Sequence, residues 1–268
     1  MTLKAGSVFF ITGGARGIGG ATASQAIQAG HKVVIADMNY AGALAHAESL
    51  GDNARAIELD VRDPAQWAGA LDYAQQQFGT IDVLVNNAGM MVPGYFIDQS
   101  PQDLKTELDV NVYGAALGLQ IGTKLMIEQG HGHIITLGSM ASFVSLRGQS
   151  FYSATKHAVR SLVYGFEQEI KDTPVTLSLV HPGAVETAML ETQIGHEANS
   201  LSFAQSTLTP EKVATKIIAL ANKPKREAVI PASQNFVVRI LGVFPTLLNM
   251  ALSSQWKGAN KARQKRAQ

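Results

Sequence analysis

The sequence predicts an α/β protein with a doubly wound parallel sheet of seven strands in a single domain. Two observations support this prediction. Seven short β-rich segments alternate with longer segments of helical character. Most of the short segments are continuous apolar runs, as expected for strands that helices cover on both faces of a parallel sheet. In chain order, the strand candidates are residues 7–12, 32–37, 54–60, 81–87, 133–139, 175–182 and 227–231.

The segments between these strands carry signals for the start of helices. In three places, a residue that caps a helix N-terminus precedes a proline, which is favoured at the first helical position. These pairs are Asp63-Pro64, Ser100-Pro101 and Thr209-Pro210. The sequence contains no internal repeat and no low-complexity linker. We therefore expect residues 1–232 to form one domain and residues 233–268, which differ in character, to form a C-terminal extension.

The composition excludes several classes of function. The 268 residues are 46% hydrophobic and 16% charged, which is enough apolar material for a sizeable core. A net charge of +1 gives no reason to expect a nucleic-acid partner. The chain has no cysteine, which excludes disulfides, iron–sulfur clusters, thiolate zinc sites and a cysteine nucleophile. We expect a cytoplasmic location, and no metal site because His131, His133 and His157 lack supporting carboxylates.

A glycine-rich turn, ITGGARGIGG, connects the first strand candidate to a segment rich in small residues. A turn at the carboxyl end of a strand aims backbone N–H groups and the positive end of the next helix at a bound anion. Glycine lets the backbone approach a pyrophosphate closely. The alternative is a tight turn that binds nothing. The spacing is Thr12-Gly13-x-x-x-Gly17-Ile18-Gly19.

An acidic residue, Asp37, ends the second strand candidate, where a carboxylate can hold the adenosine ribose hydroxyls of a dinucleotide. The turn and this carboxylate together favour a nicotinamide-type dinucleotide on a Rossmann fold, with residues 1–232 as the dinucleotide-binding domain. Asp37 and the neighbouring Met38 favour NAD, because a 2′-phosphate would meet a like charge. Arg16 supports NADP as the alternative, since a guanidinium can pair with that phosphate, unless its side chain only faces solvent.

A second informative stretch contains Tyr152 and Lys156, which are four residues apart and share one face of a predicted helix. Ser139 ends a buried strand, at the edge where a parallel sheet binds ligands. Reducing a ketone requires a proton donor, and oxidising an alcohol requires an acceptor. A tyrosine with a pKa of about 10 is a poor base at neutral pH, and a nearby ammonium lowers that pKa.

These features, in this order, make the chain resemble the compact branch of the short-chain dehydrogenase/reductase family. The matching residues span nearly the whole sequence. They are the Thr12-to-Gly19 turn, Asp60-Val61, Asn86-Asn87-Ala88-Gly89, Asn111, Ser139, Tyr152-x-x-x-Lys156, and Pro182-Gly183 followed by Thr187.

The resemblance implies a role for each of four catalytic residues. Tyr152 would be the general acid/base, and Ser139 would orient the substrate oxygen. Lys156 would bind the nicotinamide ribose and lower the pKa of Tyr152. Asn111 would hold a water that relays protons between Lys156 and solvent. The resemblance also implies a homodimer or homotetramer built on helices 102–129 and 151–171.

The predicted cofactor site combines the turn, the strand ends and the segment after the sixth strand. The resemblance implies that Asp60 and Val61 contact the adenine and that Val185 and Thr187 hold the carboxamide. The full set is Gly13, Arg16, Gly17, Ile18, Gly19, Asp37, Asp60, Val61, Asn87, Ala88, Gly89, Tyr152, Lys156, Pro182, Gly183, Val185 and Thr187.

We expect three segments to form the substrate pocket: residues 90–96, 140–149 and 189–208. Their apolar side chains predict a hydrophobic secondary alcohol or ketone as substrate, unless these residues are only core. They are Met90, Met91, Val92, Phe143, Val144, Leu146, Met189, Leu190 and Phe203, and the few charges nearby are Arg147, Glu191 and Glu197. Alternative functions are an NADPH-dependent ketoreductase of the 3-oxoacyl type and a regulatory protein that binds a dinucleotide without turnover.

The C-terminal extension combines an apolar and a basic part. Residues 235–252 are apolar apart from one arginine, and Pro245 interrupts them. Such a segment followed by basic residues can lie on an anionic membrane surface. It can equally cover the substrate pocket or contact another subunit. The basic residues are Lys257, Lys261, Arg263, Lys265 and Arg266.

Overall fold

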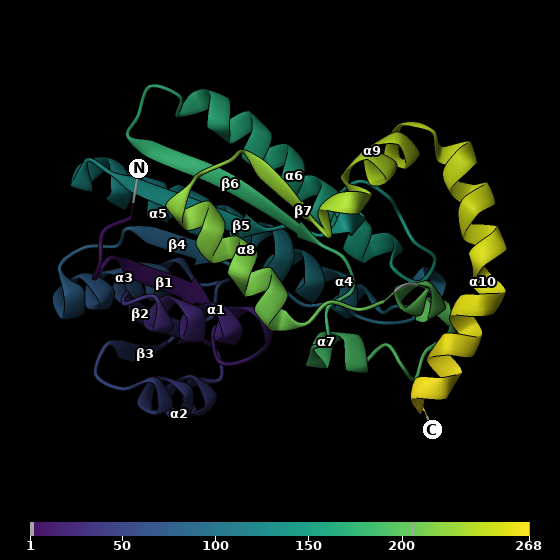
Figure 1. Cartoon of the computed structure of the whole chain (residues 1–268), viewed down its shortest axis with the longest axis horizontal. Helices are drawn as coiled ribbons and strands as arrows, with labels where there is room; N and C mark the ends of the chain where they lie inside the picture. Colours follow the sequence, from purple (N-terminus) through teal and green to yellow (C-terminus); the bar gives the residue numbers. More distant parts are fainter. Residues whose placement is uncertain (1–2, 205, 268) are drawn as a thin grey trace.

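The computed structural model describes residues 3–204 and 206–267 and contains a seven-stranded parallel sheet (Figure 1). The strand order is β3-β2-β1-β4-β5-β6-β7, so the predicted fold class is confirmed. The strands are β1 (Val8–Thr12), β2 (Lys32–Asp37), β3 (Ala54–Glu58), β4 (Val83–Asn86), β5 (Gly132–Leu137), β6 (Val175–Pro182) and β7 (Glu227–Ile230). β3 ends before the predicted residue 60, because the Asp60 N–H donates to the side chain of Gln66 instead of a strand.

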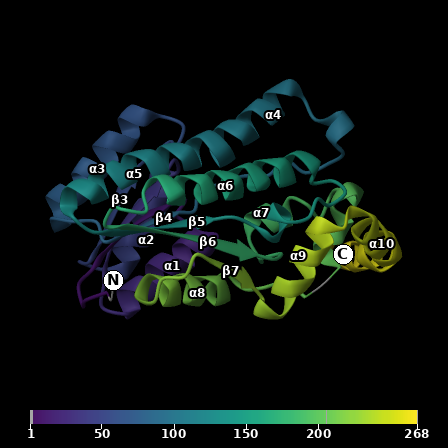
Figure 2. The ribbon, with the colours of Figure 1, turned by 90° about the horizontal axis from the view of Figure 1, so that it is seen from above.

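Helices cover both faces of the sheet (Figure 2). On β1, Phe10 packs toward one face and Phe9 and Ile11 toward the other, because side chains alternate along a strand. One face carries α3 (Pro64–Phe78), α5 (Ala115–Gln129) and α6 (Ser150–Glu169), and the other carries α1 (Gly17–Gln28), α2 (Tyr40–Leu50) and α8 (Pro210–Asn222). This burial on both faces explains why the strand segments are apolar throughout.

The predicted helix starts are present. Asp63 accepts hydrogen bonds from the N–H groups of Ala65 and Gln66, and Ser100 forms a capping box with Asp103. Thr209 likewise caps α8. These caps satisfy N–H groups that a helix start would otherwise leave unpaired.

The helix predicted over residues 102–129 is interrupted. It comprises α4 (Pro101–Leu108), a π-helical turn at Asp109–Gly114, and α5. The wider turn contains Asn111, whose side chain pairs with the backbone of Met90 on a different segment. π-turns of this kind are frequent at functional sites.

Beyond β6, short helices precede the C-terminal extension. They are α7 (Ala188–Glu191) and the 3-10 helix η4 (Glu197–Phe203), and the extension itself forms α9 (Asn235–Val243) and α10 (Pro245–Ala267). The break between these two helices falls at Phe244, directly before Pro245, where the sequence predicted an interruption. Figure 1 shows α9 and α10 beside the carboxyl ends of β6 and β7. Within the part of the chain that the structure describes, no helix is long and apolar enough to span a membrane.

Polar contacts fix both helices of the extension on the rest of the chain. In α10, Arg263 donates to the carbonyl of Ile194 and to the hydroxyl of Ser200. In α9, Arg239 forms an ion pair with Glu227 of β7. The extension is therefore packed against the sheet domain.

Candidate active site

A cavity of about 1210 Å³ lies at the carboxyl ends of the strands. β1 pairs with both β2 and β4, so the direction of the chain's winding reverses there. In doubly wound sheets, ligands bind at this position. The cavity extends from the glycine turn and Asp37 to the residues of α9.

Most residues that the sequence predicted for the site line this one cavity. Gly19 and Asn111 are the exceptions and lie behind its wall. The lining residues are Gly13, Arg16, Gly17, Ile18, Asp37, Asp60, Val61, Asn87, Ala88, Gly89, Ser139, Tyr152, Lys156, Pro182, Gly183, Val185 and Thr187.

The predicted catalytic side chains meet between β5 and α6. The hydroxyl of Ser139 lies close enough to the phenol of Tyr152 to lower the tyrosine pKa. Lys156 is buried, and its ammonium donates to the carbonyl of Leu137 at 3.0 Å. The ammonium nitrogen lies 5.7 Å from the centre of the Tyr152 ring. The arrangement brings a proton donor, a hydroxyl and a cation to one wall of the cavity.

Burial affects the pKa of Tyr152 and that of Lys156 in opposite directions. It raises the pKa of Tyr152 to about 12, although the neighbouring Ser139 hydroxyl works the other way. It lowers the pKa of Lys156 to about 8. The tyrosine pKa is therefore raised, contrary to the expected lowering, and the lysine charge is not among the groups that shift it. Burial disfavours the charged form of both groups, and this effect dominates.

Asn111 ties the π-helical turn to the loop after β4. Its side-chain oxygen accepts from the Met90 N–H at 2.9 Å, and its amide donates to the Met90 carbonyl at 2.8 Å. The amide also contacts the hydroxyl of Thr155. A Cβ on Gly89 would lie 3.2 Å from the Asn111 side-chain oxygen and 3.6 Å from the Lys156 ammonium. Glycine at position 89 therefore lets the Asn111 side-chain oxygen and the Lys156 ammonium both lie close to this backbone.

The glycine turn is fixed against β4 by hydrogen bonds. The Asn87 amide donates to the carbonyls of Thr12 and Gly13, and the Thr12 hydroxyl accepts from the Asn87 and Ala88 N–H groups. Gly13 has a φ of +62°, and a Cβ on Gly19 would overlap the Gly13 carbonyl oxygen. The turn therefore requires glycine at both positions. With α1 beginning at Gly17, it forms a cradle that fits the pyrophosphate of a dinucleotide.

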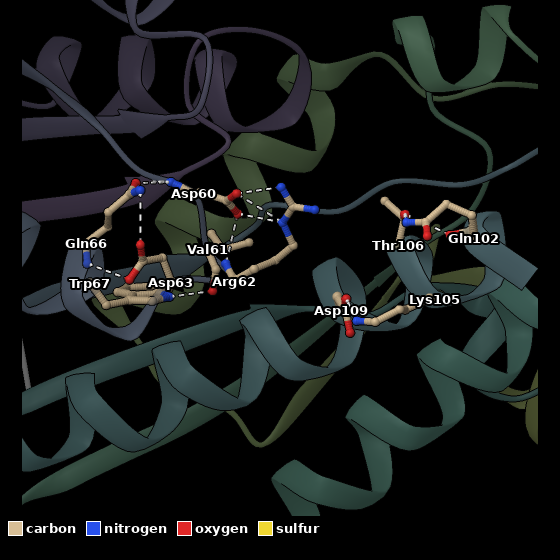
Figure 3. Close-up of polar contacts among 10 residues, drawn as sticks. All are labelled: Asp60, Val61, Arg62, Asp63, Gln66, Trp67, Gln102, Lys105, Thr106 and Asp109. Carbon is tan, nitrogen blue, oxygen red and sulfur yellow. Dashed lines mark hydrogen bonds and ion pairs between the residues drawn. The ribbon is translucent and has the colours of Figure 1, made fainter.

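The end of the cavity beside Asp37, where the sequence predicts the adenosine, has fixed acidic groups. The Asp37 carboxylate accepts from the Ala15 N–H at 3.1 Å and from the Asn39 N–H at 2.9 Å. Asp60 is paired with Arg62 at 2.6 Å, and this hydrogen-bonded pair holds the pKa of Asp60 below its ordinary value (Figure 3). Arg62 also lines the cavity. The sequence reasoning missed it, although it directly follows the predicted adenine contacts.

Arg16 is exposed at the rim of this end, where it lines the main cavity and a neighbouring hollow. At this position Arg16 can either pair with a 2′-phosphate or simply face solvent. Figure 3 also shows the exposed pair of Lys105 and Asp109, which lies outside the cavity lining.

The opposite end of the cavity is apolar, as the sequence predicted. Of the expected substrate residues, six line it: Met90, Met91, Val144, Leu146, Met189 and Leu190. The expectation was wrong for Val92, Phe143 and Phe203. Phe143 instead packs edge-on against His181, and Phe203 is buried beneath Arg266.

The charges expected near the substrate also lie outside the lining. Arg147, Glu191 and Glu197 do not contribute to the cavity wall. The charged lining residues are Lys156 of the predicted catalytic set and four residues near the end beside Asp37: Arg16, Asp37, Asp60 and Arg62.

The C-terminal extension supplies part of the wall at the apolar end of the cavity. Val237, Val238 and Leu241 of α9 and Leu252 and Gln255 of α10 line the cavity. Covering the pocket was one of three interpretations of this segment, and nothing in its own sequence selected it. Three polar residues also line this end of the cavity. The buried side chains of Gln149 and Gln193 both hydrogen-bond with the hydroxyl of Ser202.

The fold and the site define a class of protein. A parallel sheet with a dinucleotide cradle beside a serine, a tyrosine and a lysine is typical of an NAD(P)-dependent oxidoreductase. The short chain dehydrogenase family matches residues 7–198. The chain belongs to this family and is an NAD(P)-dependent dehydrogenase or reductase.

Relatives and solved structures agree with this assignment. A 3-alpha-(or 20-beta)-hydroxysteroid dehydrogenase of Mycobacterium bovis is 38% identical over 69% of this chain and 72% of the relative. An uncharacterised oxidoreductase of Staphylococcus aureus is 30% identical over 84% of this chain and 95% of its own length.

Two crystal structures have a similar fold. A short chain dehydrogenase/reductase from Burkholderia phymatum in complex with NAD has a TM-score of 0.82 and 25% identity, with 92% of this chain and 97% of the other covered. A 3-ketoacyl-(acyl-carrier-protein) reductase from Brucella melitensis complexed with NADH has a TM-score of 0.77 and 27% identity, with 85% and 98% covered.

Proposed function

We propose that this protein is an NAD-dependent oxidoreductase that interconverts a hydrophobic secondary alcohol and its ketone. The observation that carries this proposal is that Ser139 and Tyr152 line one cavity together, beside its uncharged, apolar end. A substrate oxygen can reach both hydroxyls there while its carbon skeleton contacts Met90, Val144 and Leu241. The hydroxysteroid dehydrogenase relative supports a bulky apolar substrate.

In this proposal Ser139 orients the substrate oxygen, and Tyr152 gives it a proton or takes one from it. When bound, the dinucleotide supplies or accepts the hydride. The buried Lys156 stabilises the phenolate that forms when Tyr152 gives up its proton, because opposite charges attract strongly away from water. The substrate walls from α9 and α10 exclude water from this exchange.

NAD is the proposed cofactor because Asp37 presents a carboxylate where the 2′ position of the adenosine ribose would lie. Two backbone N–H groups hold that carboxylate in place. The similar structures with NAD and NADH support the same preference. Arg16 and Arg62 are the groups that would favour a 2′-phosphate in the alternative, an NADPH-dependent 3-oxoacyl reductase.

Turnover with NAD and NADP over a panel of hydroxysteroids, other hydrophobic alcohols and 3-oxoacyl thioesters tests this proposal. We expect NAD-dependent turnover of apolar alcohols. Tyr152→Phe should lose turnover but still bind NADH, whereas Tyr40→Phe, on the exposed side of α2, should keep the activity. Full activity in Tyr152→Phe would contradict the mechanism. Faster turnover with NADP would contradict the cofactor assignment.

A second proposal concerns the outer corner, defined here as Phe236, Val243, Phe244 and Met250. These side chains are between 54% and 73% exposed. Exposed lysines follow along one face of α10 at positions 257, 261 and 265. Apolar side chains beside a row of cations fit the surface of an anionic membrane. We therefore propose peripheral membrane contact for a protein that otherwise resides in the cytoplasm.

Sedimentation with phosphatidylcholine vesicles, with and without phosphatidylglycerol, tests the membrane contact. We expect binding to the anionic vesicles only, and its loss when Lys257, Lys261 and Lys265 are replaced by glutamine. The matched control replaces the exposed Lys124, Lys171 and Lys223. Equal sedimentation of both triple variants would contradict the proposal.

Homo-oligomerisation through the helices over residues 102–129 and 151–171 stays a proposal. Large apolar side chains on these segments are exposed in the single chain: Leu108, Tyr113, Ile127 and Leu162. Sedimentation equilibrium of the purified protein tests it, and a monomer at micromolar concentration would contradict it.

A further inference from the structure

Three buried polar side chains form a hydrogen-bonded chain in the otherwise apolar wall of the cavity. The Gln149 amide donates to the Ser202 hydroxyl at 2.6 Å, and this hydroxyl donates to the Gln193 amide oxygen at 2.5 Å. The Gln193 amide nitrogen donates to the Met189 carbonyl at 3.0 Å. All three residues are at most 9% exposed and line the cavity. Polar groups in an apolar wall are costly unless they are hydrogen-bonded, so this Gln149–Ser202–Gln193 cluster requires an explanation.

The hydrogen bonds within the cluster leave part of the Gln149 amide group unused. A carboxamide has two N–H donors and an oxygen that accepts. Gln149 uses one N–H for Ser202, and its oxygen has no hydrogen-bond partner among the described residues. This oxygen does not belong to the fully buried polar atoms that lack a partner, so it keeps surface in the cavity that Gln149 lines. The amide can therefore bind a polar group inside the cavity.

Gln149 lies one helical turn before Tyr152. It caps the N-terminus of α6, and Tyr152 follows three residues later in the first turn. Residues at this spacing lie on the same side of a helix, with Cβ atoms about 5–6 Å apart. Both residues line the cavity. A molecule whose oxygen reaches Tyr152 can therefore present a second oxygen, a few bonds away, to the Gln149 amide.

The two segments that carry the cluster are fixed to each other. The Asn199 amide in η4 donates to the Gly148 carbonyl at 2.9 Å, and its oxygen accepts from the Gly94 N–H at 2.9 Å. Gly148 has a φ of +74° and directly precedes Gln149. A Cβ on Gly148 would overlap the Ala198 carbonyl, so the backbones of the loop and of η4 are in close contact. Such a site is organised before a ligand binds, which lowers the cost of binding.

The charges of the lining decide which polar group fits. Among the described residues, the charged lining side chains are Lys156 and four residues near the end beside Asp37. Arg147, two residues before Gln149, does not line the cavity. A carboxylate or an ammonium group beside the cluster would therefore lose its hydration without gaining an ion pair. A hydroxyl or a carbonyl needs only the hydrogen bonds that an amide offers, so the cluster fits an uncharged oxygen.

We propose that Gln149 binds a second, uncharged oxygen of the substrate, a hydroxyl or a carbonyl a few bonds from the reacting carbon. Ser202 and Gln193 are positioning residues that hold the Gln149 amide for this contact. The inference rests on the proposed function and narrows its substrate class to hydrophobic molecules with two uncharged oxygens. A substrate with one oxygen leaves the Gln149 amide unpaired against an apolar skeleton, which weakens its binding in the transition state.

Turnover of matched ketones tests the contact. Cyclohexanone has one oxygen, cyclohexane-1,4-dione has a second uncharged one, and 4-oxocyclohexanecarboxylate has a charged one in its place. We expect kcat/KM, counted per carbonyl, to be about tenfold higher for the dione than for cyclohexanone. The carboxylate should react more slowly than the dione.

The variant Gln149→Leu separates a substrate contact from a structural role. Leucine has a similar size but no hydrogen-bonding group. We expect kcat/KM for the dione to fall about tenfold and that for cyclohexanone to rise, because the unpaired amide is gone. Ser202→Ala should lower the preference for the dione by a smaller factor. The matched controls are Gln168→Leu and Ser161→Ala, at exposed positions of the same helix, and both should keep the preference of the unaltered protein.

Side-chain amide NMR of the whole protein observes the contact without turnover. The protein is titrated with cyclohexane-1,4-diol and with cyclohexanol in the presence of NADH, which cannot react with an alcohol. The Gln149 amide signal is assigned by its loss in Gln149→Leu. We expect this signal to shift with the diol and to stay in place with cyclohexanol, while the signal of the exposed Gln168 responds to neither.

The two measurements distinguish failure of this inference from failure of the proposed function. If neither these ketones nor any alcohol is turned over, the proposed function fails, and the NMR titration still decides whether Gln149 binds an uncharged oxygen. A preference for the dione that persists in Gln149→Leu overturns the inference and leaves the proposed function intact. A parallel fall for both ketones in Gln149→Leu, or an amide signal that ignores the diol, also overturns it.

Discussion

The guanidinium of Arg147 lies 4.2 Å from the centre of the Trp256 ring, which joins the loop after β5 to the C-terminal helix α10. The same guanidinium lies 5.3 Å from the ring of Tyr95 and donates to its hydroxyl at 3.2 Å. Three segments that surround the apolar end of the cavity therefore meet at one arginine. This contact holds α10, which supplies part of the cavity wall, against the sheet domain.

Arg147→Ala should loosen this wall. We expect the KM for the hydrophobic substrate to rise several-fold, while the affinity for NADH stays unchanged. The lost cation–π contact should lower the free energy of unfolding by about 1 kcal/mol. The control is Arg226→Ala, which removes a similar stack on Tyr164 far from the cavity. An equal rise in KM in both variants would argue against a local effect on the wall.

Asp37→Ala should weaken NADH binding about tenfold, or about 1.4 kcal/mol, because the ribose loses a charged hydrogen-bond acceptor. Quenching of protein fluorescence or the increase in NADH fluorescence measures this affinity. Asp52→Ala, at an exposed loop position, should bind NADH normally. Unchanged affinity in Asp37→Ala would remove the main support for NAD over NADP.

Gly19→Ala should abolish dinucleotide binding, because the new Cβ would overlap the Gly13 carbonyl and lie 2.7 Å from the Asn87 amide nitrogen. Both groups form the turn, so relief requires the cradle itself to move. Gly165→Ala in α6 is the matched control, because its Cβ would have open space around it. We expect the control to keep its affinity and its melting temperature, and binding by Gly19→Ala would show that the cradle tolerates a side chain.

The protein should lose stability in mild acid because of His133. Burial lowers the pKa of His133 from 6.5 to about 4, so the folded state binds fewer protons than the unfolded state between these values. Stability is therefore complete above pH 6.5 and falls as the pH decreases toward 4, by about 3 kcal/mol in total. Urea unfolding at several pH values measures this slope.

His133→Gln should flatten that dependence, while His157→Gln, at an exposed position, should leave it unchanged. The buried His181 contributes in the same direction, with its pKa lowered to about 3 by burial. A slope that persists fully in His133→Gln would assign the effect to other groups.

Local sequence patterns were sufficient to predict the sheet and most of the residues that line the glycine-turn end of the cavity. Strands buried on both faces are apolar throughout, and a turn that binds a pyrophosphate must contain glycine where a Cβ would collide. Tyr152 and Lys156 share a face because a helix repeats every 3.6 residues. Each of these features depends on residues close together in the chain, so the sequence displays it directly.

Other features depend on contacts between distant segments. Phe143 was expected in the substrate pocket, but in the fold it packs on His181 of β6. The π-helical turn around Asn111 follows from its pairing with Met90, 21 residues away. Nothing near Glu107 in the sequence distinguishes it from the exposed Glu128, because only the packing of α4 against α6 and the loop after β4 buries it.

The sequence by itself determined the parallel sheet, the glycine-rich turn after its first strand and the spacing of the predicted serine, tyrosine and lysine, because these patterns are local. The tertiary structure alone decided that α9 and α10 wall the cavity, that Arg147 lies outside it, and that Glu107 is fully buried. Burial and electrostatic coupling depend on which distant segments exclude water from a group, and no local pattern encodes that.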